Sequence, residues 1–129
     1  MASVFTQIMQ GEIPGSFVYE DEQAVAIMTI QPVQPGHVLV IPREEIDHFD
    51  DLPQELAAHL MHVSQKVAKA IKQAYPCERV SLIIAGLEVP HTHLHLIPIN
   101  TMEDMSFARL EFADGDTLKA AADKIKPFL

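Results

Sequence analysis

The chain has 129 residues, of which 48% are hydrophobic and 21% charged, a size and composition typical of one folded domain spanning residues 1–129. Eighteen acidic residues against nine basic ones give a net charge of −9. This charge argues against a nucleic acid or an anionic membrane as the main partner, because both attract basic surfaces. A single cysteine excludes an internal disulfide. Without a long apolar run or a signal-peptide pattern, we expect a cytoplasmic protein.

The first third of the chain predicts one short helix followed by strands. Apolar residues at helical spacing favour a helix over residues 3–10, and Gly11 ends it. Two short β-type runs, at residues 17–19 and 24–30, are separated by an acidic turn. A third run, at residues 37–41, is apolar at nearly every position, as expected of a strand covered on both faces, and Pro42 ends it.

The remainder predicts the longest helix, over residues 53–74, with apolar residues three and four positions apart on its buried face. We expect Asp51 to cap its N-terminus, and His59 and His62 to lie on its exposed face. Further strands are predicted at residues 79–85 and 91–99, and a last helix at 117–126, capped by Asp114 or Asp116. The pattern favours an α+β fold: an antiparallel sheet of about five strands, a long central helix and short terminal helices.

Three histidines alternate at the start of the last predicted strand: His91, His93 and His95. Side chains of a strand alternate between its faces, so all three would lie on one face. One interpretation is a solvated strand face. A second is a metal site, but His91 and His95 would start about 13 Å apart on an extended strand. Only a neighbouring pair could then share a zinc ion, and further ligands would have to come from elsewhere.

A third interpretation is nucleophilic catalysis at phosphorus. A neutral imidazole is a good nucleophile, and its phosphorus adduct hydrolyses readily, so one difficult step becomes two easier ones. Flanking imidazoles can donate hydrogen bonds to phosphate oxygens and to the leaving group. They also disfavour one another's charged forms, which keeps the nucleophile unprotonated and makes the three histidines titrate as a coupled set.

The residues around these histidines resemble the histidine triad (HIT) family. Residues 91–97 are similar to its H-φ-H-φ-H-φ-φ signature, where φ is hydrophobic, with Thr92 the weak match. Residues 35–43 resemble its G-H-x-L-V-x-P-K segment, and residues 5–14 resemble the start of the small HIT hydrolases. The resemblance implies a HIT-like fold, a homodimer and a nucleotide bound over the sheet. It also implies cleavage of a nucleoside-monophosphate ester or amide, such as a phosphoramidate or a dinucleoside polyphosphate, through a nucleotidyl-histidine intermediate.

Roles for four histidines follow from their positions in these motifs. The resemblance implies that His93 is the nucleophile and that His95 binds phosphate and the leaving group. It implies that His91 orients His93, largely through its backbone carbonyl, and that His37 holds His91 from the neighbouring strand. No cofactor is expected. Zinc-binding relatives carry an N-terminal C-x-x-C pair where this chain has Ser3 and Thr6, so we expect no metal.

Some of the positions expected to bind a purine nucleotide depart from the family pattern. The resemblance places four residues at the nucleotide: Thr29, Ile30, Glu88 and Val89. Thr29 stands where many relatives have an aspartate that holds the ribose hydroxyls, and a threonine cannot accept from both hydroxyls as a carboxylate does. Glu88 places a negative charge where a hydroxyl would meet phosphate. The alternative is therefore a nucleotide-binding or interaction module of the same fold with little turnover.

Overall fold

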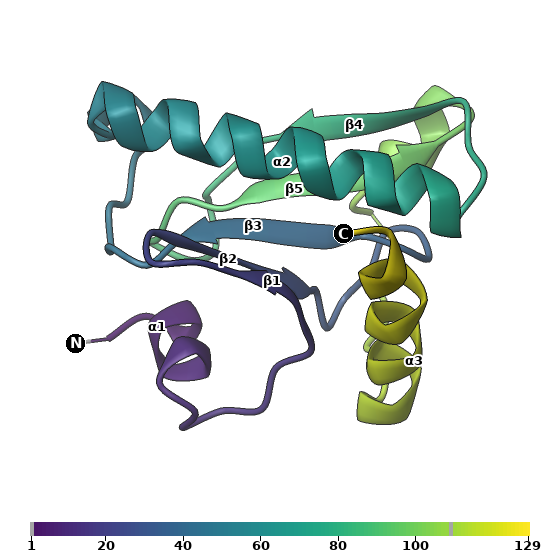
Figure 1. Cartoon of the computed structure of the whole chain (residues 1–129), viewed down its shortest axis with the longest axis horizontal. Coiled ribbons are helices and arrows are strands. Elements are labelled where there is room, and N and C mark those ends of the chain that lie inside the picture. Colours follow the sequence, from purple (N-terminus) through teal and green to yellow (C-terminus); the bar gives the residue numbers. More distant parts are fainter. Residues whose placement is uncertain (1, 109) are drawn as a thin grey trace.

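The computed structural model, which describes residues 2–108 and 110–129, is built around one antiparallel sheet (Figure 1). In spatial order, its strands are β1 (Phe17–Glu20), β2 (Ala24–Met28), β3 (Val38–Pro42), β5 (Leu94–Ile99) and β4 (Arg79–Ile83). The α-helices are α1 (Val4–Met9), α2 (Gln54–Ala74) and α3 (Gly115–Ile125). Three short 3-10 helices are η1 (Phe49–Asp51), η2 (Met102–Met105) and η3 (Lys126–Phe128). The predicted α+β class and five-stranded sheet are confirmed.

One face of the sheet is closed by α2, which lies along it (Figure 1). The apolar stripe of α2 packs on alternate residues of the central strands, because strand side chains point to opposite faces in turn. This main core includes Leu60 and Ile71 of α2, Val40 of β3 and Leu96 of β5. At the β1–β2 end, α3 joins the same core. No helix of the described residues is both long and apolar enough to cross a membrane.

The opposite face of the sheet is also apolar, but a much shorter helix covers it. Val25 and Ile27 of β2 and Leu39 of β3 form a second buried cluster with Phe5 of α1. Because α1 has only six residues, it covers part of this face and leaves the rest open to ligands. Figure 1 shows α1 and α2 on opposite sides of the sheet.

Gly36 forms the turn that leads into β3, with a φ of 92°, in the left-handed region that favours glycine. A Cβ built at this position would lie 2.8 Å from a ring carbon of Tyr75. The turn and the close approach together explain why a glycine directly precedes His37.

Several predicted boundaries change in the structure. Asp51 does not cap α2: it lies in the 3-10 helix η1, and the N-cap residue is Pro53, which has no side-chain hydrogen-bond donor or acceptor. Of the two predicted caps of α3, Asp114 accepts a hydrogen bond from the Thr117 N–H at 2.8 Å. The last predicted strand begins at Leu94, so His91 and His93 lie in the irregular segment before it.

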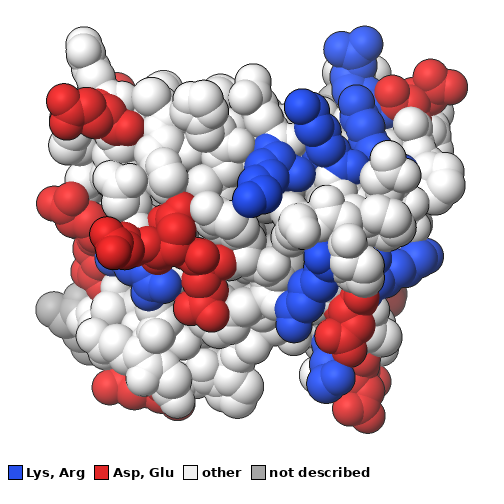
Figure 2. All heavy atoms as spheres, in the orientation of Figure 1, with Lys and Arg blue, Asp and Glu red and all other residues white. Residues whose placement is uncertain are grey.

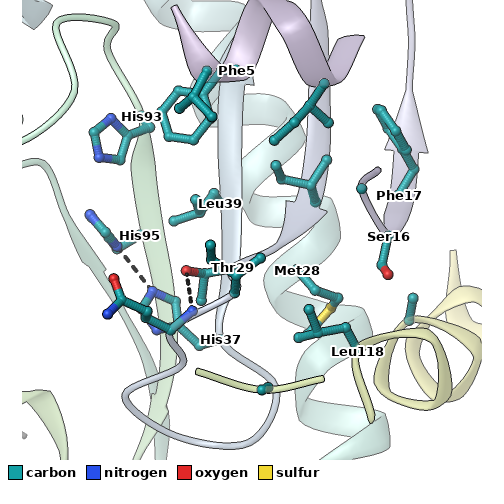
Figure 3. Close-up of a pocket in the computed structure, with 18 of the residues that line it drawn as sticks. Phe5, Ser16, Phe17, Met28, Thr29, His37, Leu39, His93, His95 and Leu118 are labelled. Atoms are coloured by element: carbon teal, nitrogen blue, oxygen red, sulfur yellow. Dashed lines mark hydrogen bonds between the residues drawn. The ribbon is translucent and has the colours of Figure 1, made fainter. Parts of the chain in front are cut away.

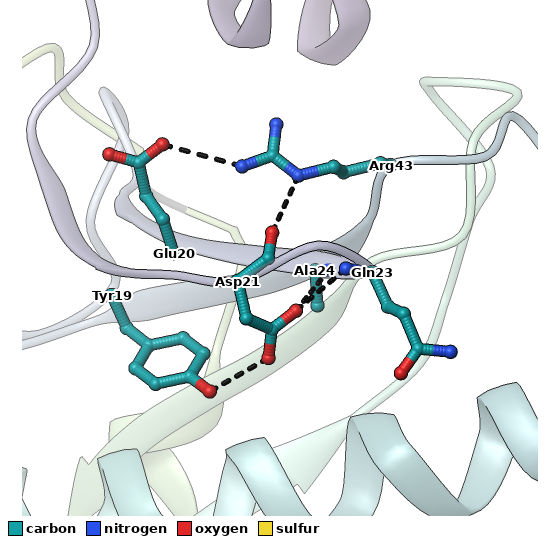
Figure 4. A network of polar contacts seen from close by, with 6 residues as sticks. All are labelled: Tyr19, Glu20, Asp21, Gln23, Ala24 and Arg43. Carbon is teal, nitrogen blue, oxygen red and sulfur yellow. Dashed lines mark hydrogen bonds and ion pairs between the residues drawn. The ribbon is translucent and has the colours of Figure 1, made fainter.

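Asp21, in the β1–β2 turn, is the centre of a polar network (Figure 4). One oxygen accepts hydrogen bonds from the backbone N–H groups of Gln23 and Ala24, and the other accepts from the Tyr19 hydroxyl at 2.7 Å. His59 of α2 lies 2.7 Å from that second oxygen and is half-buried, so the expectation that it lies free on the surface is wrong. Burial opposes ionisation, but the hydrogen bonds prevail and lower the pKa of Asp21 to about 2.

We expect Asp21→Ala to lower the free energy of unfolding by about 2 kcal/mol, because it leaves several partly buried donors without an acceptor. Urea denaturation near neutral pH measures this difference. Glu22→Ala, at the exposed neighbouring position, is the matched control and should change stability by less than about 0.5 kcal/mol. Equal effects of the two substitutions would contradict the proposed importance of the network.

Candidate active site

His37 and His95 meet because β3 and β5 are paired. Leu39 of β3 lies opposite His95 in the register, and His37, directly before β3, is two residues from Leu39, so both side chains point to the same face of the sheet. The two rings lie 3.0 Å apart, from His37 Nε2 to His95 Nδ1. The expectation that His37 holds His91 is therefore wrong. His91 lies at the other end of β3, where its Nε2 is 2.7 Å from the carbonyl oxygen of Pro42.

His91 is fully buried and is held at both ring nitrogens. Besides Pro42, its partner is the hydroxyl of Ser3, with Oγ 2.6 Å from Nδ1. The backbone carbonyl of His91 lies 2.7 Å from Nδ1 of His93. This is the contact that the motif implied for orienting His93.

The hydrogen bonds around His93 determine which of its ring nitrogens is available for chemistry. A carbonyl oxygen can only accept, so Nδ1 of His93 carries a proton and donates it to the His91 carbonyl. In the neutral ring, the lone pair is then on Nε2. His93 lines the open cavity on the second face of the sheet (Figure 3). The arrangement of a neutral imidazole with a free Nε2 lone pair is the one that a nucleophilic histidine requires.

A second series of hydrogen bonds determines the tautomer of His95. The Val33 N–H donates to Nδ1 of His37 at 3.0 Å, so in the neutral His37 ring the proton is on Nε2. His37 Nε2 therefore donates to Nδ1 of His95, and a neutral His95 carries its own proton on Nε2. His93 and His95 thus differ at Nε2: His93 has a lone pair and His95 has an N–H donor.

Burial keeps these rings neutral. Desolvation has the largest effect on the pKa of His37, His93 and His95. The pKa of His37 is lowered to about 3 and that of His95 to about 4. Neighbouring imidazoles lower both values further. Burial also lowers the pKa of His93, although its hydrogen bond to the His91 carbonyl and the nearby charge of Glu88 oppose the shift. At neutral pH, His93 is therefore unprotonated.

Two phenylalanine rings pack against the histidines of the site, one against His93 and the other against His95. Phe5 of α1 packs edge-on against His93, with ring centroids 4.9 Å apart, and Phe107 packs edge-on against His95 at 5.2 Å. The rings of His93 and His95 are themselves 4.9 Å apart. Sequence reasoning did not assign either phenylalanine to the site. The alternation of histidines with other residues is a clear signal in the sequence. Phe5 fits an ordinary amphipathic helix, and Phe107 lies in a segment without periodicity, so neither gives such a signal.

The cavity beside the triad has a volume of about 1140 Å³, large enough for a nucleotide and its leaving group. Figure 3 shows His93, His95 and His37 along one side and Phe17, Met28 and Leu118 along the other. Its lining also contains the four predicted nucleotide-binding residues: Thr29, Ile30, Glu88 and Val89. His91 is fully buried and does not line the cavity. Residues 2–108 and 110–129 contain no cluster of three or more side chains suited to hold a metal ion.

The charge of the molecule is distributed unevenly around this cavity. Figure 2 shows a group of blue side chains over the C-terminal half of α2, a mixture of blue and red ones over α3, and red ones mainly at the opposite end. Lys119 of α3 and Lys126 of η3 belong to the cavity lining, although both also lie near Asp123, at 2.9 and 3.8 Å. Besides these two lysines, the described lining consists of imidazoles, apolar groups, the neutral polar side chains of Ser16, Thr29 and Gln31, and the carboxylates of Glu88 and Asp123. In these tautomers, His95 Nε2–H is the imidazole donor left for an anion at the triad, because the N–H groups of His37 and His93 already donate to other groups.

The five-stranded α+β fold and the row of histidines define a class of domain that this chain shares with known proteins. The family model described as "HIT domain" matches residues 10–102, and the chain belongs to this family. The "Adenosine 5'-monophosphoramidase HNT1" of Saccharomyces cerevisiae is 36% identical over 98 residues, which are 75% of this chain and 62% of that protein. An uncharacterized HIT-like protein of Methanocaldococcus jannaschii is 34% identical over 99 residues, 74% of this chain and 77% of that protein.

A solved structure agrees over almost the whole chain. The crystal structure of a HIT-like protein involved in cell-cycle regulation from Bartonella henselae superposes with a TM-score of 0.87 at 30% sequence identity. The match covers 98% of this chain and 96% of that one. The resemblance inferred from the motifs is confirmed at the level of family and fold.

Proposed function

We propose that this protein hydrolyses a nucleoside 5′-phosphoramidate, releasing the nucleoside monophosphate, with His93 as the nucleophile. The observation that carries the proposal is the free Nε2 of His93, unprotonated because burial lowers its pKa and Nδ1 is bound to the His91 carbonyl. The yeast relative named as an adenosine 5′-monophosphoramidase supports this choice of substrate over a dinucleoside polyphosphate.

The chemistry then takes two steps. In the first, Nε2 of His93 forms a bond to phosphorus and the bond from phosphorus to the amide nitrogen breaks. The leaving nitrogen keeps the electron pair and takes a proton from water, while His95 Nε2–H donates a hydrogen bond to it or to a phosphate oxygen. In the second, water attacks phosphorus, the bond to His93 breaks, and the water proton returns to solvent. The net reaction consumes one water and yields the monophosphate and ammonia.

The direct test is incubation of the purified protein with adenosine 5′-phosphoramidate, followed by chromatography of the nucleotides. We expect steady release of AMP and an equal amount of ammonia. Diadenosine polyphosphates should be cleaved much more slowly. Binding of AMP without any release from either substrate would reject the proposed hydrolase and leave the binding module as the function.

The binding module is favoured by one specific observation, the acidic side chain at the cavity. Glu88 lies close enough to His93 for its charge to raise the pKa of that ring, and the same charge opposes an anionic phosphate. We expect Glu88→Gln to tighten AMP binding about threefold at low salt, as measured by calorimetry. The gain should shrink as ionic strength rises, and Glu22→Gln, at the exposed β1–β2 turn, should leave the affinity unchanged. An unchanged affinity in Glu88→Gln would place the phosphate away from Glu88.

We also propose that the protein forms a homodimer. Strand β4 is at the edge of the sheet and is bonded on one side only, to β5, and its Leu82 is exposed. An uncovered edge strand with an apolar side chain is suited to pair with another copy. Light scattering during gel filtration measures the mass, and a monomer at micromolar concentration would contradict this proposal.

A further inference from the structure

The N-terminal residues contact the triad through one buried hydrogen bond between side chains 88 positions apart in the chain, from Ser3 to His91. Ser3 is 9% exposed and His91 is 0% exposed, so water does not compete for this contact. The Oγ–Nδ1 distance is 2.6 Å, within the range of a strong hydrogen bond. Ser3 lies outside the histidine motif, and the two-step mechanism gives it no role.

The direction of this bond follows from the partners on either side. Pro42 offers only a carbonyl oxygen, so His91 Nε2 donates to it. In the neutral ring, Nδ1 is then the acceptor, and the hydroxyl of Ser3 is the donor. The Ser3 oxygen in turn accepts from the Thr6 N–H at 3.1 Å, as the N-cap of α1. The hydroxyl has one proton, and it is directed to His91 Nδ1 at 2.6 Å rather than to Thr6 Oγ1 at 3.4 Å, while the Ser3 oxygen caps the helix.

The Ser3 backbone is also fixed. Its N–H donates to Oε1 of Glu45, at a distance of 2.6 Å. Two residues further along, Phe5 packs against both His91 and His93. The start of α1 therefore contacts this pair of histidines through a polar group and an aromatic ring.

We propose that Ser3 is a positioning residue for the nucleophile, acting through His91. The Ser3 hydroxyl and the Pro42 carbonyl fix the His91 ring in one tautomer and one orientation. A fixed His91 holds its carbonyl 2.7 Å from His93 Nδ1, which keeps the proton there and the lone pair on Nε2. This inference adds to the hydrolase proposed above, and its kinetic consequences rest on that proposal. The geometry of Ser3, His91 and His93 does not depend on it.

The kinetic test compares Ser3→Ala with Ser3→Thr in the full chain, using adenosine 5′-phosphoramidate as substrate. Without the hydroxyl, we expect kcat to fall about tenfold, because the nucleophile is less well oriented, while KM changes less than about twofold. Threonine keeps the hydroxyl and should restore most of kcat. Gln7→Ala is the matched control: it removes another hydrogen bond of α1, from Gln7 to the Ala2 carbonyl, and should leave kcat unchanged.

Stability is measured in parallel, because the loss of an N-cap also weakens α1. If Ser3→Ala unfolds at the assay temperature, the pair Ser3→Thr and Ser3→Val gives the same comparison between side chains of equal shape. A kcat within twofold of wild type in a folded variant that lacks the hydroxyl would overturn the proposal. A loss of kcat that threonine does not restore would overturn it as well.

A spectroscopic readout separates this proposal from the proposed function. Long-range ¹⁵N–¹H correlation spectra of histidine-labelled protein distinguish a protonated ring nitrogen from an unprotonated one. We expect wild-type His91 to be protonated at Nε2 and His93 at Nδ1, and Ser3→Ala to shift both residues toward mixed tautomers. If the wild type released no AMP, these spectra would still decide the role of Ser3. Unchanged histidine spectra in Ser3→Ala would reject it.

Discussion

Replacing His93 with asparagine is expected to reduce AMP release from adenosine 5′-phosphoramidate by about a thousandfold or more, at unchanged stability. The reason is the difference between the two ring nitrogens that face the cavity. His93 presents a lone pair on Nε2, whereas His95, with Nδ1 accepting from His37, presents a proton at the equivalent nitrogen. His95 therefore cannot replace the nucleophile, and the variant loses the covalent route.

Asparagine is the informative replacement because it can still donate a hydrogen bond toward the His91 carbonyl. The cavity should keep its shape, and we expect AMP to bind to the variant with an affinity close to that of wild type. His62→Asn is the matched control: this histidine is exposed on α2, and its loss should not change turnover. Undiminished AMP release by His93→Asn would exclude His93 as the nucleophile.

The intermediate can be measured directly. Acid-free quenching of the wild type during turnover, followed by peptide mass spectrometry, should find the adenylyl group on the peptide that contains residues 91–95. The same peptide from His93→Asn should carry none. An adduct on the variant would assign the nucleophile to another residue of that segment.

The sequence predicted the parts of the site that depend on local pattern. The alternation of His91, His93 and His95 indicated a shared site, and the motif supplied the contact between His93 and the His91 carbonyl, a bond between residues two positions apart. The sheet was also predictable, because its strands are short apolar runs ended by glycine, proline or acidic turns. These features require only the residues and their nearest neighbours.

Most of the contacts that the sequence did not predict join residues far apart in the chain. His37 bonds to His95 because Leu39 pairs with His95, and the pairing of two strands more than fifty residues apart leaves no mark on either strand alone. The same holds for Ser3 and His91, and for His59 and Asp21. Phe107 was missed for a different reason: it reaches His95 from a segment between η2 and α3 whose course follows no period.

The buried histidines should also make the fold sensitive to mild acid. The folded-state pKa of His37 is about 3 and that of His95 is about 4, against about 6.5 in an unfolded chain. Below pH 6.5 the unfolded chain therefore binds protons that the folded protein does not. The stability that these neutral rings contribute is complete above pH 6.5 and is lost as the pH falls toward the folded values.

We expect the free energy of unfolding to fall by about 4 kcal/mol between pH 7 and pH 5, about 2 kcal/mol for each of the two histidines, measured by urea denaturation at constant ionic strength. This interval lies above the range in which Asp21, with a pKa of about 2, contributes. In His37→Gln the same acidification should cost about 2 kcal/mol less, because glutamine does not titrate, whereas His62→Gln should behave as wild type. An equal loss in His37→Gln would mean that other groups cause the acid sensitivity. A smaller loss of unfolding free energy in His37→Gln would instead show that protonation of His37 in the unfolded chain drives acid unfolding. The ring that holds His95 in its donor tautomer would then also make the fold sensitive to acid.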